Sequence, residues 1–155
     1  VFGVLGNHDD DRDMPAALAA RGVEVLKDAR TRLTIRGEPI ELVGIRFWTR
    51  RTADIAALVA GASAPVVLLA HDPRRLADAE ALGIPLVLAG HTHGGQIVLP
   101  AVGALAARKF PVVAGAARRD RTAIFVSRGI GCVYVPVRIN CPPDVAVITL
   151  TPEAG

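Results

Sequence analysis

Gly90-His91-Thr92-His93-Gly94-Gly95-Gln96 is the stretch around which the rest of the sequence is arranged. It follows a short apolar run and contains two of the four histidines. The other two also follow apolar runs, since His8 comes after residues 2–5 and His71 after residues 66–70. Short apolar runs bounded by glycine or proline are typical of buried strands. The sequence therefore predicts three buried strands, each ending in a polar loop that contains histidine.

Helices are predicted between these strands. Asp13-Met14-Pro15 and Asp72-Pro73 each place a helix-capping aspartate before a proline that suits the first turn. The front of the chain therefore alternates strands and helices, whereas the back is mostly strand-like. We predict an α/β fold with helices at 13–21, 52–60 and 73–82. Strands are predicted at 2–5, 23–26, 66–70 and 86–89, and a hairpin at 33–45 that turns at 37–39. Further strands are predicted at 97–99, 112–114, 123–127 and 145–150.

Five polar side chains follow the predicted parallel strands: Asn7, His8, His71, His91 and His93. Because sites in open α/β sheets gather beyond the carboxyl ends of the strands, we expect these side chains to converge if the strands are neighbours. A single histidine after a strand is more often a hydrogen-bonded loop residue than a ligand. All four histidines share this context, however, and imidazoles with an amide oxygen suit first-row transition metals. The group predicts a metal site.

The glycines beside these residues support this interpretation. We expect Gly6 and Gly90 to let the chain turn sharply after each strand. Gly94 and Gly95 would let the backbone approach a metal or a phosphate closely.

Composition excludes several other classes of protein. The 155 residues suffice for one domain or part of one, and no apolar run approaches the roughly 20 residues of a membrane span. The net charge of +3 comes mainly from scattered arginines, which favours a solvated surface over a nucleic-acid interface. Cys132 and Cys141 have no zinc-ribbon spacing, and two reduced thiols are favoured over a disulfide.

Several short motifs, taken in order, resemble a known family. Gly6-Asn7-His8-Asp9, His71-Asp72-Pro73 and Gly90-His91-Thr92-His93 resemble the later motifs of the calcineurin-like metallophosphoesterase superfamily. The extension through Ile97 and the tail at residues 126–144 resemble its bacterial, often membrane-associated phosphodiesterase branch. The resemblance implies a four-layer α/β/β/α sandwich. The family's first motifs, Asp-x-His and Gly-Asp, do not occur here, and the sequence starts at Val1. We therefore expect residues 1–155 to be the C-terminal part of a single such domain, with the first strands and motifs missing.

The resemblance also implies a binuclear metal centre. Asn7, His71 and His91 resemble the ligands of one metal, and His93 resembles a ligand of the other. Two metals about 3.5–4 Å apart can clamp a phosphate and activate water. The family's remaining ligands belong to the two absent motifs. We therefore expect this chain alone to bind metal weakly and to hydrolyse little.

Further residues acquire roles through the same resemblance. His8 is similar to the family histidine beside the scissile phosphate, where it would stabilise charge or protonate the leaving oxygen. Asp9 either orients His8 or caps its own loop. Arg128 and Arg138 are candidates for bidentate phosphate contacts, with surface ion pairs as the alternative.

The implied function is metal-dependent hydrolysis of phosphoester bonds, by a phosphodiesterase or phosphatase. We expect two divalent ions (manganese, iron or zinc), no organic cofactor, a phosphoester substrate and no nucleic-acid partner. The branch suggests a lipid-linked or nucleotide-sugar pyrophosphate, similar to UDP-diacylglucosamine. Membrane association is expected of a longer parent, through residues before Val1, with the present chain soluble. The alternative is a non-catalytic binding module with the same fold.

Overall fold

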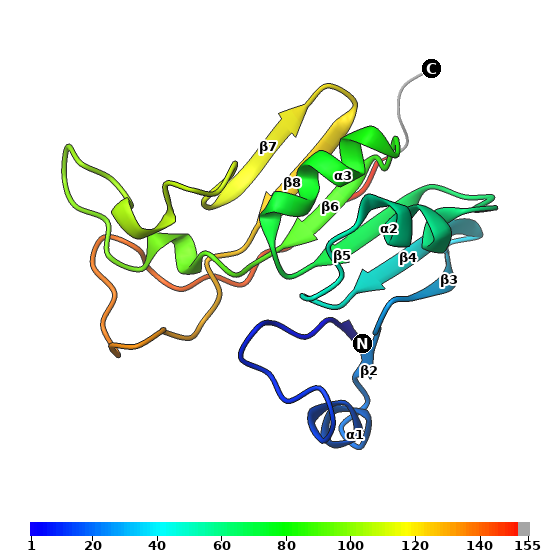
Figure 1. The fold of residues 1–155 in the computed structure, drawn as a ribbon, viewed down its shortest axis with the longest axis horizontal. Coiled ribbons are helices and arrows are strands. Elements are labelled where there is room, and N and C mark those ends of the chain that lie inside the picture. Colours follow the sequence, from blue (N-terminus) through cyan, green and yellow to red (C-terminus); the bar gives the residue numbers. More distant parts are fainter. Residues whose placement is uncertain (152–155) are drawn as a thin grey trace.

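A six-stranded mixed sheet forms the centre of the computed structural model, which describes residues 1–151. Its strand order is β3-β4-β5-β6-β8-β7 (Figure 1). Strands β4, β5, β6 and β8 are parallel, and β3 and β7 are antiparallel at the two edges. The strands are β3 (Ala29–Ile35), β4 (Glu38–Ile45), β5 (Val66–Ala70), β6 (Leu86–Ala89), β7 (Gly115–Arg119) and β8 (Thr122–Val126). The predicted α/β class is confirmed.

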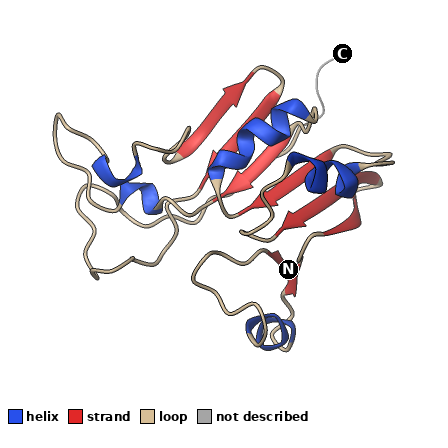
Figure 2. Cartoon of the chain, in the orientation of Figure 1, coloured by secondary structure: helices blue, strands red, loops and turns tan. Residues whose placement is uncertain are grey.

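Two helices cover one face of this sheet (Figure 2). They are α2 (Thr52–Val59) and α3 (Leu76–Ala81), the latter entered through the 3-10 turn η1 (Pro73–Arg75). Alternate strand residues such as Val43, Leu68 and Val87 have no exposed area on this face. They pack against Ile55 of α2 and Leu76 of α3. This core fixes the strand ends that lead into the site.

A separate unit lies against part of the other face of the sheet. The two-residue strands β1 (Phe2–Gly3) and β2 (Glu24–Val25) pair in parallel and flank α1 (Met14–Ala19). Leu26 packs there against Leu42 and Val67 of the large sheet. The sequence left open whether residues 2–5 neighbour the other two histidine-bearing strands; β1 does not, because both edges of β5 are taken by β4 and β6. The four-layer sandwich stays a prediction.

Most of the strands predicted between residues 97 and 150 are absent from the structure. Residues 145–150 form no strand, and Val145 and Val147 are 85% and 96% exposed. Residues 112–114 form none either, since β7 begins at Gly115, and residues 97–99 make only isolated bridges. These predictions are wrong because apolar alternation creates a strand only where another strand offers hydrogen-bonding partners.

Two loop segments form what we call the lobe, residues 96–110 and 130–139. It contains the short 3-10 turn η3 (Leu105–Ala107) and projects from the end of the sheet (Figure 1). A bridge between Ile97 and Ile139 joins the two segments. The Gln96 amide donates to the carbonyls of Val133 and Val135, and its oxygen accepts from the Val133 N–H. The lobe is therefore one connected piece.

Local signals differ in how well they match the structure. Asp72 accepts a hydrogen bond from the Arg74 N–H at 2.9 Å, so the predicted cap is confirmed. Asp13 makes no side-chain cap, because Asp10 instead accepts from the backbone of Arg12 and Asp13. The hairpin turns at residues 36–37 rather than 37–39. Within residues 1–151, no helix has the length and apolar character needed to cross a membrane.

Candidate metal centre

Three polar donor atoms meet where β1, β5 and β6 end. The Asn7 Oδ1 lies 3.1 Å from the His71 Nε2, and that nitrogen lies 2.9 Å from the His91 Nδ1. Two nitrogen ligands at right angles on one cation, with bonds of about 2.1 Å, would lie about 3 Å apart. Both distances therefore match the spacing of ligands on a single cation.

The fold positions each of these side chains. Strands β5 and β6 are parallel neighbours, so His71 and Gly90-His91 follow the same edge of the sheet. Asn7 arrives on the loop after β1, from the smaller sheet. A Cβ on Gly6 would lie 2.7 Å from the His71 Cε1, so this glycine makes room for the imidazole. The expected convergence of Asn7, His71 and His91 occurs, although β1 belongs to a different sheet.

Both ligand-like histidines are biased towards the neutral form. Burial, followed by the nearby His91, lowers the pKa of His71 to about 4. Burial also lowers the pKa of His91, with Asp72 acting in the opposite direction. Neutral imidazoles offer the lone pairs that a cation requires. The donor set and its charge state therefore fit a divalent transition metal.

The loop that carries His91 and His93 holds an unusual backbone conformation. His91, His93 and Gln96 have φ angles of 70°, 52° and 55°, in the left-handed region that non-glycine residues rarely adopt. Thr92 fixes the loop, since its hydroxyl donates to the Val113 carbonyl and accepts from the Gly94 N–H. Such strain persists only where the surroundings impose it, and it clusters at functional sites.

The two glycines of this loop make close packing possible. A Cβ on Gly94 would lie 2.7 Å from the Cys141 Sγ, and one on Gly95 would lie 2.3 Å from the Ala104 Cβ. Neighbouring side chains fill the space that a Cβ would occupy. The expectation that the backbone of these glycines approaches a metal or a phosphate stays a prediction.

His93 lies in the same cavity but outside the three-atom cluster. Its Nδ1 lies 3.3 Å from the Gly131 carbonyl oxygen, which leaves the Nε2 available. Metal-binding histidines commonly donate their second N–H to such a carbonyl. Across residues 1–151, no three side chains of the His, Cys, Asp and Glu types are grouped to hold a metal ion. The assignment of Asn7, His71 and His91 to one cation and of His93 to a second stays a prediction.

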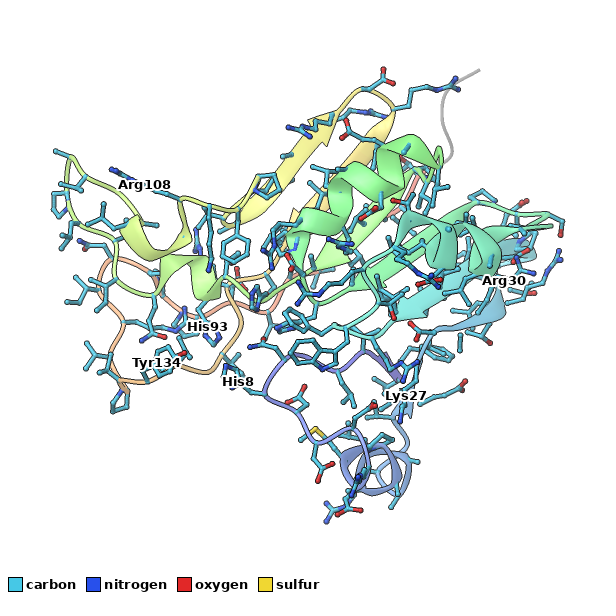
Figure 3. The ribbon with its side chains drawn as sticks, viewed as in Figure 1. His8, Lys27, Arg30, His93, Arg108 and Tyr134 are labelled. Atoms are coloured by element: carbon cyan, nitrogen blue, oxygen red, sulfur yellow. The ribbon has the colours of Figure 1, made fainter. Side chains whose placement is uncertain are left out.

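His8 and Asp9 lie at the opening of the cavity. His8 is exposed and lines the same cavity as His93 (Figure 3). The Asp9 Oδ2 accepts from the Gly6 N–H at 2.7 Å, which is the loop-capping contact weighed from the sequence. A role of Asp9 in orienting His8 stays a prediction.

Neither candidate arginine lines the cavity. The Arg138 guanidinium donates to the carbonyl oxygens of Gly131, His93 and Arg128, and so joins the tail to the His93 loop. Its donors are therefore committed to backbone. The Arg128 side chain packs against Gly94. Phosphate binding by Arg128 and Arg138 stays a prediction, and the contacts of Arg138 favour a structural role.

The cavity around these groups is large and mostly apolar. Its volume is about 910 Å³, and the lobe supplies one wall, including Leu105, Lys109, Phe110 and Tyr134. The Phe110 ring packs edge-on against His91 with ring centroids 5.1 Å apart. None of these four lobe residues was identified from the sequence, because single apolar or basic residues in a loop carry no motif.

Phe47 forms part of the surroundings of the metal-centre histidines. Its ring centroid lies 5.9 Å from that of His71 and 5.5 Å from that of His91. Aromatic rings beside the imidazoles keep them partly desolvated, which agrees with their lowered pKa values.

Comparison with known proteins identifies several similar chains. The phosphodiesterase YaeI of Escherichia coli is 32% identical over 162 residues, which cover 97% of this chain and 58% of that protein. The uncharacterised metallophosphoesterase YkuE of Bacillus subtilis is 29% identical over 95% of this chain and 54% of its own length. An uncharacterised metallophosphoesterase of Aquifex aeolicus is 32% identical over 96% of this chain and 60% of its own. The chain thus spans less than two thirds of these curated relatives. No family model and no solved structure matches it.

Proposed function

Because the chain belongs to the calcineurin-like metallophosphoesterase family, we propose that it forms part of an enzyme that hydrolyses phosphoester bonds with divalent metal ions. The observation that carries this proposal is that Asn7 Oδ1 and His91 Nδ1 each lie within hydrogen-bonding distance of His71 Nε2. Two neutral imidazoles and an amide oxygen form a ligand set for manganese, iron or zinc.

We assign the following roles to the residues of this chain. Asn7, His71 and His91 hold one cation, and the Nε2 of His93 contributes to a second. When bound, the cations supply Lewis-acid polarisation of the phosphoryl group and a more acidic water. His8, exposed at the opening of the cavity, stabilises the developing charge or donates a proton to the leaving oxygen. The apolar wall of the lobe accommodates the part of the substrate that is not phosphate.

The finer form of the proposal concerns the substrate and the metals. A binuclear centre with manganese, iron or zinc would act on a diester or monoester. A lipid-linked or nucleotide-sugar pyrophosphate similar to UDP-diacylglucosamine combines a phosphate with an apolar portion. A cavity lined both by histidines and by Leu105, Phe110 and Tyr134 supports that combination.

A second candidate function is that of a non-catalytic binding module. The observation in its favour is that no three His, Cys, Asp or Glu side chains are grouped to hold a metal ion among residues 1–151. Such a module would bind a metal and a phosphate without turnover.

Metal binding and hydrolysis distinguish the two functions. Calorimetric titration with Mn²⁺ should give one site in the 155-residue chain, and His71→Ala should weaken binding at least tenfold. His8→Asn should leave Mn²⁺ binding unchanged but lower the rate on bis(p-nitrophenyl) phosphate by 10²-fold or more. Because the 155-residue chain alone is expected to hydrolyse little, the binding module would be supported by Mn²⁺ binding without any hydrolysis in the full-length protein. Mn²⁺ binding that is unaffected by His71→Ala would overturn the proposed centre.

A further inference from the structure

Arg138 holds His93 at two separate points. Its Nη1 donates to the backbone carbonyl of His93 at 3.1 Å. Its Nη2 and Nε both donate to the carbonyl oxygen of Gly131, at 2.5 and 3.1 Å. That oxygen is the one that the His93 ring contacts through its Nδ1. One guanidinium therefore joins the backbone of His93 to the hydrogen-bond partner of its side chain.

The Gly131 carbonyl determines which nitrogen of the His93 ring carries the proton. A backbone carbonyl oxygen only accepts hydrogen bonds, so the Nδ1 that lies 3.3 Å from it is the N–H donor. A neutral imidazole carries a single N–H, so the Nε2 keeps its lone pair. His93 lines the cavity of the metal centre, where such a lone pair can bind a cation.

The segment that carries Gly131 depends on Arg138 for its position. Residues 130–132 form no helix or strand, and Gly131 is exposed. Among the described residues, the hydrogen bonds of this segment are those that the Gly131 oxygen accepts from His93 and Arg138. The contacts of Gln96 begin only at Val133. Without the guanidinium, the His93 ring would therefore be the sole partner of the oxygen that orients it.

The backbone of His93 requires support as well. Its φ of 52° lies in the left-handed region, which a residue other than glycine keeps only where its surroundings impose it. Its carbonyl oxygen accepts from three groups: the Arg138 Nη1, the Gln96 N–H at 3.0 Å and the Cys141 Sγ at 3.3 Å. Of these three groups, the Arg138 guanidinium is the one that also holds the Gly131 oxygen.

We propose that Arg138 is a positioning residue for His93, which it holds in the tautomer protonated at Nδ1, with the Nε2 lone pair free to bind a cation. It acts through the Gly131 carbonyl and does not itself contact the substrate. Arginine suits this role because its planar fork reaches several carbonyls at once, whereas lysine presents one compact ammonium. Only the use of the Nε2 by a second metal rests on the proposed function.

Long-range proton–nitrogen NMR spectra of the 155-residue chain test the proposal without metal or catalysis. The chain contains four histidines, and His93→Gln identifies the signals of His93. At about pH 8.5, where an unperturbed imidazole is neutral, His93 should show only the tautomer protonated at Nδ1. In Arg138→Met both tautomers should appear. His93 protonated mainly at Nε2 in the unaltered chain would overturn the proposal, whatever the variants show.

Arg108→Met is the matched control. It removes the same charge and also one hydrogen bond to a lobe carbonyl, that of Val102. It should leave the tautomer of His93 unchanged, and equal mixing of tautomers in Arg108→Met and Arg138→Met would overturn the proposal. Arg138→Lys keeps the charge but not the fork, so both tautomers should appear in it too.

Circular dichroism shows whether the variants keep the fold. Arg138 lies outside both hydrophobic core clusters, so the spectra of Arg138→Met and Arg138→Lys should match that of the unaltered chain. Loss of the fold in both variants would show that Arg138 supports the chain as a whole, and would overturn its specific role at His93.

Metal binding separates this proposal from the proposed function. In the full-length protein, Arg138→Met should weaken binding of the second Mn²⁺ about tenfold and leave the first within about twofold. Equal weakening of the two ions would overturn the role of Arg138 at His93. A single His93 tautomer that depends on Arg138, in a protein that binds no second metal, would refute the binuclear centre and leave the positioning role intact.

Discussion

Gly6 has a role that its position after a strand does not reveal. Its missing Cβ provides the space in which the His71 imidazole lies, at 2.7 Å from the position a Cβ would take. Gly6→Ala should therefore displace His71 from Asn7 and His91 and weaken Mn²⁺ binding about 10- to 100-fold. Calorimetric titration measures this effect, and circular dichroism should show that the fold is retained.

Gly90 provides the matched control for this substitution. It too lies between a strand and a histidine of the metal centre, but a Cβ there would meet nothing within 4 Å. Gly90→Ala should leave the Mn²⁺ affinity within about twofold of the unaltered chain. Equal losses for the two variants would show that glycine flexibility, and not the space beside His71, governs the site.

Asp28 joins two structural elements, since it lies between β2 and β3 and receives three hydrogen bonds from the end of β4. Its carboxylate accepts from the Arg46 N–H, the Arg46 Nε and the Thr49 hydroxyl. Burial raises its pKa, but these hydrogen bonds outweigh that effect and the net pKa is lowered. Asp28→Asn should lower the free energy of unfolding by about 1–2 kcal/mol at pH 7.

Because the pKa of Asp28 is lowered in the folded protein, the stabilisation that its carboxylate provides decreases as the pH falls. A carboxylate with a depressed folded pKa stabilises the protein fully above its unfolded pKa of about 3.9 and loses this effect as the pH falls through the folded value. Urea titrations should therefore show the difference between Asp28→Asn and the unaltered chain shrinking below about pH 4. Asp54, in an exposed pair with Arg51, is the control, and Asp54→Asn should have little effect at any pH.

The elements that local sequence predicts well are those whose partners are also local. Residues 66–70 form β5 as predicted, because an unbroken apolar run between turn residues suits a strand buried on both faces. Asp72 caps the following turn for equally local reasons. Residues 145–150 have the same strand character but remain unpaired, because pairing depends on a neighbour that no local pattern specifies.

The same distinction applies to the candidate metal centre. His71 and His91 could be placed together because they end neighbouring strands of one sheet. Phe110 and Tyr134 could not, since they reach the cavity through loops whose path depends on Gln96 and on the bridge between Ile97 and Ile139. The sequence thus predicted the polar side of the cavity and missed its apolar wall.

At the scale of the whole molecule, apolar surface is distributed unevenly between the two faces of the sheet. The helix face is sealed by α2 and α3, whereas Leu69, Leu86 and Leu88 on the other face are only partly buried. Residues 145–150 add a second exposed apolar segment, Val-Ala-Val-Ile-Thr-Leu, which carries no charge. A six-residue stretch of high strand propensity without charge or proline is a template for pairing with other chains.

We therefore expect the 155-residue chain to self-associate through residues 145–150 as its concentration rises. Val147 is 96% exposed, so Val147→Lys should change the free energy of unfolding by less than about 0.5 kcal/mol. Its charge should nevertheless raise several-fold the concentration at which static light scattering detects oligomers, because a lysine on an unpaired strand opposes edge-to-edge association. Trp48→Lys, an equivalent change at a 65% exposed residue outside any strand, should shift that concentration much less. Equal shifts for the two variants would show that general surface charge, and not the unpaired segment, controls association.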